Sequence, residues 1–596
     1  MTLPGRGPAR AVSLFFGVFV ALQILAAVVR ADRHVLLWWE GAPVVFVAFS
    51  WFWALFRSVL AGAAAAWLAG TIAPILDGRR SERATASVMA GIAFVAGLGT
   101  ALRFVAPVSI PPGVWVDVVL EAERLLRFPG SIPWVGGTPL GVEGAHEIVS
   151  YLLLRAYEGL FALFGRGDVG LLSLSAVPGA LAVPAGAWLA YEAFGGRTAV
   201  VAGAFVALSS RSLALSRWGY TPATLVPLAL ATMAAALAAR RKRSLLLAAL
   251  SGVFAGLGMH THSSSVIVPI ALAAWSAGTW KEPEARARAG VAAISAFLAA
   301  APWLLGFVQH PGYVGGRLRD VNVANPVRDV HARDLGLAAR FASNAVDYSG
   351  LFVFASDPNG RHGFPDRPAV PMPVGIAVVL GVAVLAGRVL QDVGAPRALL
   401  WLAAGSLAAG VLSDPGGAPN TVRAAILVAT GLVIGAWVTV RVAEELGRRL
   451  RVRPGTLLAL AVTGFCARET VPFLASWRDH GQVAIRFCPD ESTAGRALRR
   501  LGTAPVILEE GVVSHAIVLE TLAAPPDPAL PVPRIPTASA AALLASPPPA
   551  PSFWIVGRAD FPLPLSAAGW TVSRAVSTGP SSALYVFRVR RPMPPA

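Results

Sequence analysis

The side chains that could do chemistry stand out because the chain around them is apolar: 55% of the 596 residues are hydrophobic and 14% are charged. A charged group at membrane depth, or in a loop folded back onto the membrane, is expensive to desolvate and is a functional candidate by default. The candidates on this basis are Asp117, Arg217, the pair His260 and His262, Arg319, the cluster Asp357–His362, and Arg423.

These residue types suggest two complementary kinds of chemistry. A positioned carboxylate such as Asp117 can take the proton that an attacking hydroxyl must lose. Arginines bind phosphate oxygens bidentately and stabilise negative charge as it develops on a leaving group. The alternatives are that Asp117 is a carboxylate on a solvated surface helix, and that each arginine anchors the chain to lipid headgroups. Arg361 and His362 share one long loop, which favours the phosphate interpretation for the set.

The segment Met259–Ser265 (M-H-T-H-S-S-S) is a polar break in an apolar run. Two histidines at positions i and i+2 point well apart on a helix, so the pair does not predict a metal site. We expect His262 to line the mouth of a substrate cavity. Local hydrogen bonding by the histidines and serines within their helix is the alternative.

Several motifs are missing from the sequence. It contains no Gly-x-x-x-x-Gly-Lys-Ser/Thr loop for ATP, which argues against a self-powered pump, and no His-Glu-x-x-His zinc pair. The two cysteines, Cys466 and Cys488, form neither a disulfide framework nor a metal cluster. The sequence therefore implies no cofactor, and no ligand set supports a divalent metal.

The elements that position these residues are membrane spans. A soluble protein carries about 25% charged residues, and a bilayer crossing needs roughly 20 apolar ones. Stretches near or above that length are Val12–Val29, Ala42–Leu76, Thr85–Val105, Leu171–Leu189, Val266–Trp280, Val291–Val308, Val374–Leu390, Asn420–Val440 and Leu457–Leu474. Shorter apolar pieces are Val200–Ser210, Leu225–Ala239 and Leu245–Gly258. Together they predict an all-α polytopic membrane protein with roughly 12–14 spans.

The net charge of +17 does not indicate a nucleic-acid partner. Basic residues concentrate in the cytoplasmic loops of membrane proteins, and Arg79–Arg83, Arg240–Arg243 and Arg448–Arg453 fit such loops. The many arginines beside few lysines are typical of a GC-rich bacterial genome. Arg79–Arg83 places the start of the next span in the cytoplasm and its exit outside. The direction of the crossings between Gly165 and Arg240 stays open.

Three regions follow from the pattern. Residues 1–80 hold extra N-terminal membrane helices, and residues 81–477 form the membrane core with long outer loops at 108–146 and 309–373. Within the first loop, Val114–Arg127 predicts an amphipathic helix at the membrane surface. Residues 478–596 predict a small α/β domain on the outer face. Its expected helices are Ala494–Leu501 and His515–Ala523, and its expected strands lie near Pro505–Glu509, Phe553–Gly557, Trp570–Ala575 and Ala583–Arg590.

A series of motifs resembles the GT-C glycosyltransferases. The string Pro112-Gly-Val-Trp-Val-Asp117, directly after a core span, is similar to their opening loop. More narrowly it resembles bacterial relatives of glycosyltransferase family 39, the protein mannosyltransferase and aminoarabinose transferase type. The likeness continues in order through Leu163–Gly165, Tyr191–Arg197, Ser216–Tyr220, Ala255–Gly258, Asp357–Pro365, Asn420–Arg423 and the tail that follows Trp477.

This resemblance implies a fold, a reaction and a site. Asp117 matches the catalytic base of the family. Many relatives carry Asp-Glu there, and this chain has Val118 instead, but Glu121 lies one helical turn on and shares the face of Asp117. The donor would be a sugar on a polyprenyl monophosphate, transferred with inversion to a lipid, glycan or protein acceptor on the periplasmic side of a bacterial inner membrane. Residues expected to bind the substrate or the lipid phosphate are Arg217, His262, Arg319, Asp357, Asn359, Arg361, His362 and Arg423.

Two other functions stay open at this stage. A transporter or lipid flippase would use the same cavity without chemistry, and it predicts internal repeats and mid-span charges that the sequence does not clearly show. A catalytically inactive relative acting as a scaffold is suggested by Val118 beside Asp117. A scaffold should tolerate Asp117→Asn, whereas an enzyme should lose turnover without losing expression.

Overall fold

The computed structural model describes 17 stretches of the chain: residues 86–106, 109–139, 148–218, 222–280, 282–311, 323–324, 336–389, 394–413, 418–484, 487–501, 504–511, 515–524, 529, 531–546, 548–550, 552–577 and 584–590. The helices expected in residues 1–80 and the candidate Arg319 lie outside the described residues.

Within the described stretches, six helices are long and apolar enough to cross a bilayer: α3 (Ala86–Phe104), α7 (Asp168–Phe194), α10 (Pro222–Lys242), α13 (Pro283–Gln309), α19 (Ala425–Leu450) and α20 (Pro454–Ser476). Five shorter apolar helices pack among them: α8 (Gly196–Leu208), α11 (Leu245–Gly258), α12 (Ile267–Ala277), α17 (Met372–Arg388) and α18 (Ala395–Val411). Sequence analysis missed α18, whose uncharged stretch begins only after Arg397 and is shorter than a full crossing.

The burial of these helices explains why they belong in a membrane. In the most apolar stretch of α10, 89% of the residues are buried, and in α19 83% are, so these two helices form the centre of the bundle. The corresponding share is 17% in α3, 17% in α13 and 22% in α20. Helices that are apolar all round yet mostly uncovered by protein need lipid as their solvent.

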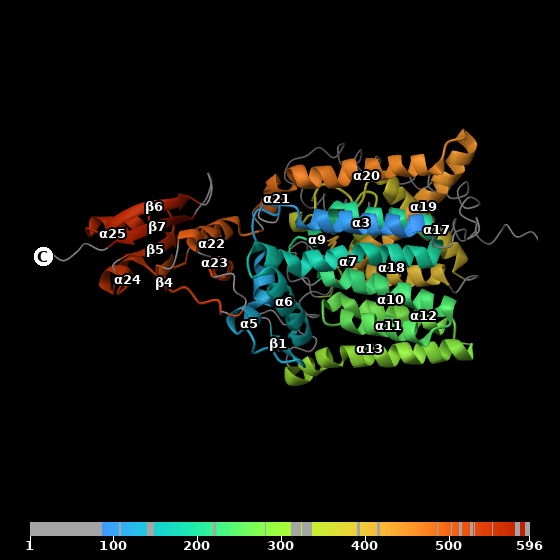
Figure 1. Ribbon diagram of the computed structural model, residues 1–596, viewed down its shortest axis with the longest axis horizontal. Helices are drawn as coiled ribbons and strands as arrows, with labels where there is room; N and C mark the ends of the chain where they lie inside the picture. Colours follow the sequence, from blue (N-terminus) through green and yellow to red (C-terminus); the bar gives the residue numbers. More distant parts are fainter. Residues whose placement is uncertain are drawn as a thin grey trace, which may run out of the picture.

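The two ends of the bundle differ, because α5 (Glu123–Arg127), α6 (Tyr151–Phe164) and the C-terminal domain lie at one end only (Figure 1). The other end is basic, with Arg240–Arg243 where α10 ends and Arg451–Arg453 in the short turn between α19 and α20. Arg241, near the end of α10, donates two hydrogen bonds of 2.8 Å to Glu192, near the end of α7. Helices α7 and α10 therefore run in the same direction with α8 returning between them, which settles the direction of these crossings.

The opposite end carries the outer loops. The first contains α4 (Val116–Glu121), α5 (Glu123–Arg127) and the hairpin of β1 (Gly137–Pro139) with β2 (Ile148–Ser150), followed by α6 (Tyr151–Phe164). The single surface helix expected at Val114–Arg127 is thus two short helices that meet at Ala122. Val118 and Val119 on α4 are buried in an apolar cluster with residues of α6 and of the C-terminal domain, so this side of α4 faces protein. The expected place of this segment on the membrane surface stays a prediction.

The C-terminal domain is a five-stranded mixed sheet in the order β4-β3-β5-β7-β6. Strand β3 pairs in parallel with β5, and β7 pairs antiparallel with both β5 and β6. Its elements are α22 (Pro489–Leu501), β3 (Val506–Glu509), α23 (Ala516–Ala523), β4 (Thr537–Ala538), α24 (Ala540–Ala545), β5 (Ser552–Gly557), α25 (Pro562–Ala567), β6 (Thr571–Ser577) and β7 (Tyr585–Arg590). The predicted fold class, a helical membrane bundle with a small C-terminal α/β domain, is confirmed. The predicted domain limits stay predictions.

Candidate active site

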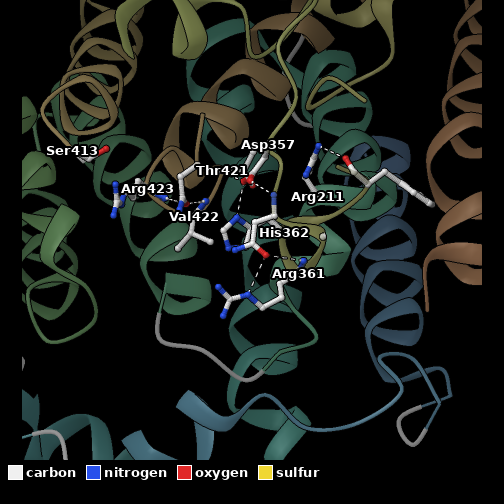
Figure 2. Close-up of polar contacts among 12 residues, drawn as sticks. Arg211, Asp357, Arg361, His362, Ser413, Thr421, Val422 and Arg423 are labelled. Atoms are coloured by element: carbon white, nitrogen blue, oxygen red, sulfur yellow. Dashed lines mark hydrogen bonds and ion pairs between the residues drawn. The ribbon is translucent and has the colours of Figure 1, made fainter. Parts of the chain in front are cut away.

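The second outer loop, between α16 (Leu337–Ser349) and α17, folds into a compact turn (Figure 2). Its centre is the 3-10 helix η3 (Gly360–His362). The Asn359 side-chain oxygen caps η3 by accepting from the backbone N–H of Arg361 at 3.2 Å, and it also accepts from Arg361 Nε at 3.1 Å. Asp357 Oδ1 accepts from the Asn359 backbone N–H at 2.9 Å. These are the Asx contacts that Asp and Asn favour in turns, so the local sequence itself selects this shape.

Asp357 attaches this loop to the start of α19. Its Oδ2 accepts from His362 Nδ1 at 2.6 Å, and from the backbone N–H and hydroxyl of Thr421 at 2.6 and 2.7 Å. The Asp357 side chain is fully buried. Burial by itself raises the pKa of Asp357, but the hydrogen bond from His362, the charge of Arg211 and the Thr421 N–H outweigh it and hold this pKa below its ordinary value. Asp357 is therefore an ionised anchor.

His362 is oriented by Asp357 on one side and by Trp218 on the other. Burial lowers the pKa of His362, so the imidazole is neutral, and the proton on Nδ1 is the one donated to Asp357. Its ring stacks on Trp218, with 4.9 Å between the centroids and 10° between the planes. Among the described residues Nε2 has no hydrogen-bond partner. An imidazole held in this tautomer presents Nε2 as an acceptor for a hydroxyl.

Arg361 joins the two outer loops. Its guanidinium carbon lies 3.8 Å from the centre of the Trp115 ring and 5.9 Å from that of Trp218. Trp115 is the N-cap of α4, and Asp117 lies in the first turn of that helix. This cation–π contact holds Arg361 of the second loop beside the segment that carries Asp117. The structure thus brings the segment that leads into α4 against Arg361, which is far away in the sequence.

Glu121 ends α4 on the buried side. It is 5% exposed and accepts a hydrogen bond of 3.5 Å from the Tyr157 hydroxyl of α6. Asp117, by contrast, is half-buried. The two carboxylates share one short helix, as the i, i+4 spacing predicted, but they differ in solvation. Asp117 is the more accessible proton acceptor.

Arg423 belongs to a capping turn that begins α19. The Asn420 side chain accepts from the backbone N–H groups of Val422 and Arg423 at 3.0 and 3.2 Å. In Figure 2 the Arg423 guanidinium lies apart from the turn that holds Arg361 and His362. Its predicted contact with the lipid phosphate stays a prediction.

Arg217 binds backbone carbonyls at the end of α3. Its guanidinium donates to the backbone carbonyls of Ile110 at 2.8 Å, Leu102 at 2.8 Å and Arg103 at 3.2 Å, and also to those of Val105 and Ala106. These are the unsatisfied carbonyls at the C-terminal end of α3 and in the loop after it. This arrangement favours a role in closing α3, and the predicted role of Arg217 in phosphate binding gains no support from it.

The histidine pair makes local and interhelical hydrogen bonds. His262 Nδ1 lies 2.7 Å from the Ser264 hydroxyl and caps the 3-10 helix η1 (Ser263–Val266). His260 lies 2.6 Å from the Ser150 hydroxyl and 2.8 Å from the Ala299 carbonyl, so it links β2 to α13. The His262 contact agrees with the local hydrogen bonding that sequence analysis gave as the alternative, whereas the His260 contacts are long-range. The substrate role of His262 stays a prediction.

Sequence analysis missed Arg211, which lies in the short helix α9 (Ser210–Leu215). Arg211 is 4% exposed and donates from Nη2 to the carbonyls of Phe364 at 2.6 Å and Arg367 at 2.7 Å, so it holds the loop after η3. Its Nη1 has no hydrogen-bond partner among the described residues. The positive φ of +133° at Gly363 lets the loop pass close to this side chain. The available signal was an arginine directly after an apolar run.

Two cavities flank Trp218. One has about 430 Å³ of empty space, with Arg211, His362 and Thr421 on one side and apolar side chains of α8, α10 and α19 on the other. The second has about 310 Å³ and is bounded by the opening loop, the first turns of α7, Arg217 and Trp218. The cluster is therefore placed between an apolar space inside the bundle and a more polar space beneath the opening loop. Within the described part of the chain, no group of three or more His, Cys, Asp or Glu side chains is placed to hold a metal.

Comparison with known proteins supports the resemblance found in the motifs. Residues 152–305 match the family model described as dolichyl-phosphate-mannose-protein mannosyltransferase. This match confirms the expected likeness to GT-C glycosyltransferases of the mannosyltransferase type over that part of the chain. No curated protein is similar enough to count as a match.

Solved structures with a related arrangement are distant. The apo oligosaccharyltransferase of Archaeoglobus fulgidus is 15% identical with a TM-score of 0.45, and the alignment covers 73% of this chain and 64% of that chain. This chain thus spans less than two thirds of that relative. ArnT from Cupriavidus metallidurans bound to undecaprenyl phosphate is 13% identical with a TM-score of 0.47, and the alignment covers 85% of this chain and 98% of that one.

Proposed function

We propose that this protein is a membrane glycosyltransferase that moves a sugar from a polyprenyl-monophosphate donor to a lipid, glycan or protein acceptor. The observation that carries the proposal is the stacking of Arg361 on Trp115 at 3.8 Å. Trp115 lies two residues before Asp117 in the sequence. This stacking contact supports a site in which the Arg361 cation binds the phosphate and the half-buried Asp117 carboxylate takes the proton. The apolar cavity behind His362 and Thr421 supports a donor with a hydrocarbon tail. The family match over residues 152–305 supports a lipid-phosphate sugar as the donor.

In the proposed reaction the acceptor oxygen attacks the anomeric carbon and its proton passes to Asp117, which acts as the general base. The bond between the anomeric carbon and the phosphate oxygen breaks, and the lipid phosphate leaves with the bonding electrons. Arg361 stabilises the charge on that phosphate. With one base and no separate nucleophile, a single displacement inverts the anomeric centre. His362 Nε2 is an acceptor in its neutral form, so we assign it to a substrate hydroxyl rather than to phosphate oxygens.

The proposed location is a bacterial inner membrane, with the site and the C-terminal domain on the periplasmic side. The basic turns at the opposite end of the bundle support this orientation, because basic loops stay in the cytoplasm. Fusing alkaline phosphatase to the C-terminus should give an active reporter, and a green fluorescent protein fusion there should stay dark. The reverse pattern would place the site in the cytoplasm.

The deciding experiment is transfer of radiolabelled sugar from polyprenyl-phosphate donors by the purified full-length chain. We compare the native chain with Asp117→Asn and with Asp479→Asn, a matched change at a carboxylate that is 66% exposed. Label should reach an acceptor with the native chain and the control but not with Asp117→Asn. Equal transfer by all three chains would remove Asp117 as the base. A folded native chain that binds donor without transferring sugar would indicate the inactive scaffold, and donor crossing a vesicle without transfer would indicate a transporter.

A further inference from the structure

A third cavity lies at the basic end of the bundle, on the far side from the candidate active site. It has about 360 Å³ of space, including the open solvent at its mouth, between the ends of α10, α11 and α12 and the start of α13. Its polar lining includes Arg240, Arg288, Ser276 and Thr279. Most of its other lining residues are alanines, which leave the wall smooth and apolar.

Close packing of two helices explains where this cavity begins. Gly252 of α11 faces the Ala292 carbonyl of α13 so closely that an added Cβ would lie 2.1 Å from that oxygen, and at Gly256 the distance to the Ala296 carbonyl would be 2.3 Å. Small residues four apart let membrane helices approach in this way. One turn nearer the basic end, Ala248 replaces glycine and lines the cavity.

The lining is positively charged. Arg240 is half-buried and makes no hydrogen bond or ion pair with any described residue. Arg288 is 11% exposed, and its partners Glu282 and Glu284 lie 4.0 and 3.5 Å away with 58% and 62% of their side chains exposed. Ion pairs with such exposed carboxylates are weak. Among the residues that the structure describes, no carboxylate lines the cavity.

The surroundings of the cavity match the headgroup level of a bilayer. Trp280, which follows the lining residue Thr279, is 55% exposed, and Leu246 on α11 is 70% exposed. Tryptophan concentrates at the membrane–water interface, and basic pockets between helices on the cytoplasmic side suit phosphate headgroups. A lipid would contact the apolar rim with its hydrocarbon chains, whereas a soluble anion would gain nothing from that contact.

We propose that this cavity binds the headgroup of an anionic phospholipid from the leaflet at the basic end of the bundle. Arg240 and Arg288 hold the phosphate, the Ser276 hydroxyl donates to it, and an acyl chain follows the alanine-lined wall. The proposal is independent of the sugar-transfer reaction.

Native mass spectrometry of the full-length, delipidated chain tests this site with phosphatidylglycerol, phosphatidylcholine and soluble glycerol 3-phosphate. Phosphatidylglycerol should occupy the tightest site at least about tenfold more strongly than phosphatidylcholine, and Arg240→Ala should weaken it about tenfold, the effect of one charge-assisted hydrogen bond. The control is Arg197→Ala, an arginine at the same end that is 50% exposed, and it should leave the binding unchanged.

Three results would overturn the proposal: equal affinity for the two lipids, no effect of Arg240→Ala, or glycerol 3-phosphate binding as tightly as the lipid. Arg240→Lys should keep most of the affinity because the charge remains. The double variant Arg240→Ala/Arg288→Ala should abolish the preference. If the double variant does not fold, the single change decides the question, because Arg240 has no structural partner among the described residues.

Discussion

At the scale of single residues, the site depends on a buried carboxylate that accepts three hydrogen bonds on one oxygen. Asp357 Oδ2 holds His362 and both donors of Thr421, while Oδ1 shapes the turn through Asn359. Asn359 and His362 belong to the loop, and Thr421 lies just before α19. The loss of the negative charge should therefore weaken the contacts of all three residues together.

Asp357→Asn should therefore lower the transfer rate by about 10- to 100-fold, because hydrogen bonds to a charged group contribute about 1.5–3 kcal/mol. An amide cannot accept from all three donors with the strength of a carboxylate. The rate would be measured with the radiolabel assay beside Asp366→Asn, a change in the same loop at a side chain that is 62% exposed. An equal effect of both changes would contradict the assigned role of Asp357.

The lowered pKa of His362 predicts how stability varies with pH. In the unfolded chain this histidine takes up a proton near its ordinary pKa of 6.5, whereas burial keeps it neutral in the folded protein below that pH. The unfolded state then binds more protons, so stability should fall as the pH drops from 6.5 towards the folded pKa, by at most about 1.4 kcal/mol per pH unit. His362→Asn should make the thermal unfolding midpoint depend less on pH over this range. An unchanged slope would contradict the assignment.

At the scale of elements, α4 is positioned by the C-terminal domain. An added Cβ on Gly113 would lie 2.0 Å from the Phe487 carbonyl, and the Val114 N–H donates to the Ser492 hydroxyl at 3.0 Å. The segment that leads into α4 thus lies directly on the chain that enters α22. The helix that carries Asp117 takes its place from this contact rather than from the membrane bundle alone.

Gly113→Ala should displace the start of α4 and reduce the transfer rate more than it reduces donor binding, because the donor cavity is on the other side of Trp218. Overpacking of this kind costs about 1–3 kcal/mol. The matched control is Gly159→Ala in α6, where an added Cβ meets nothing within 4 Å. Both variants would be compared by transfer rate and by donor affinity. A Gly113→Ala chain with full activity would show that this contact does not position Asp117.

At the scale of the whole molecule, two ion pairs attach the C-terminal domain to the loop end of the bundle. Arg127 of α5 lies 2.5 Å from Glu520 of α23, and Asp168 at the start of α7 lies 2.5 Å from Arg496 of α22. The Val532 N–H adds a hydrogen bond of 2.8 Å to the Leu126 carbonyl. The side chains of the first pair are 11% and 5% exposed, so water screens them little.

Reversing one charge of that pair should weaken the docking, and reversing both should restore most of it. Arg127→Glu places two buried carboxylates together, which is strongly unfavourable. We expect a lower thermal unfolding midpoint and faster release of the domain by limited proteolysis, with recovery in Arg127→Glu/Glu520→Arg. A double variant as weak as the single one would show that the ion pair does not hold the two parts together.

The amino-acid sequence by itself was sufficient for the properties that depend on short-range pattern. Apolar stretches predicted the spans, because a bilayer needs a minimum length of apolar chain. Alternation of turn residues and apolar runs located β3, α23, β5, β6 and β7 of the C-terminal domain to within about two residues. It placed the start of α22 five residues late, and it missed β4, α24 and α25. The Asp357–His362 cluster was also recognised, as charged and polar residues in a long loop, but its turn was not predicted. The turn forms through local contacts in which Asp and Asn side chains cap nearby N–H groups.

The tertiary structure decided which charged residues act together. Arg217 and Arg361 are both arginines near the outer end of the bundle, yet one closes α3 through backbone carbonyls and the other stacks on Trp115. Arg211 was not recognised because its partners lie more than 150 positions further along the chain. The sequence pattern indicates which chemistry a side chain can perform. Whether that side chain is desolvated, and which partners it has, depends on long-range packing. For that reason the composition of the site was partly predictable, and its geometry was not.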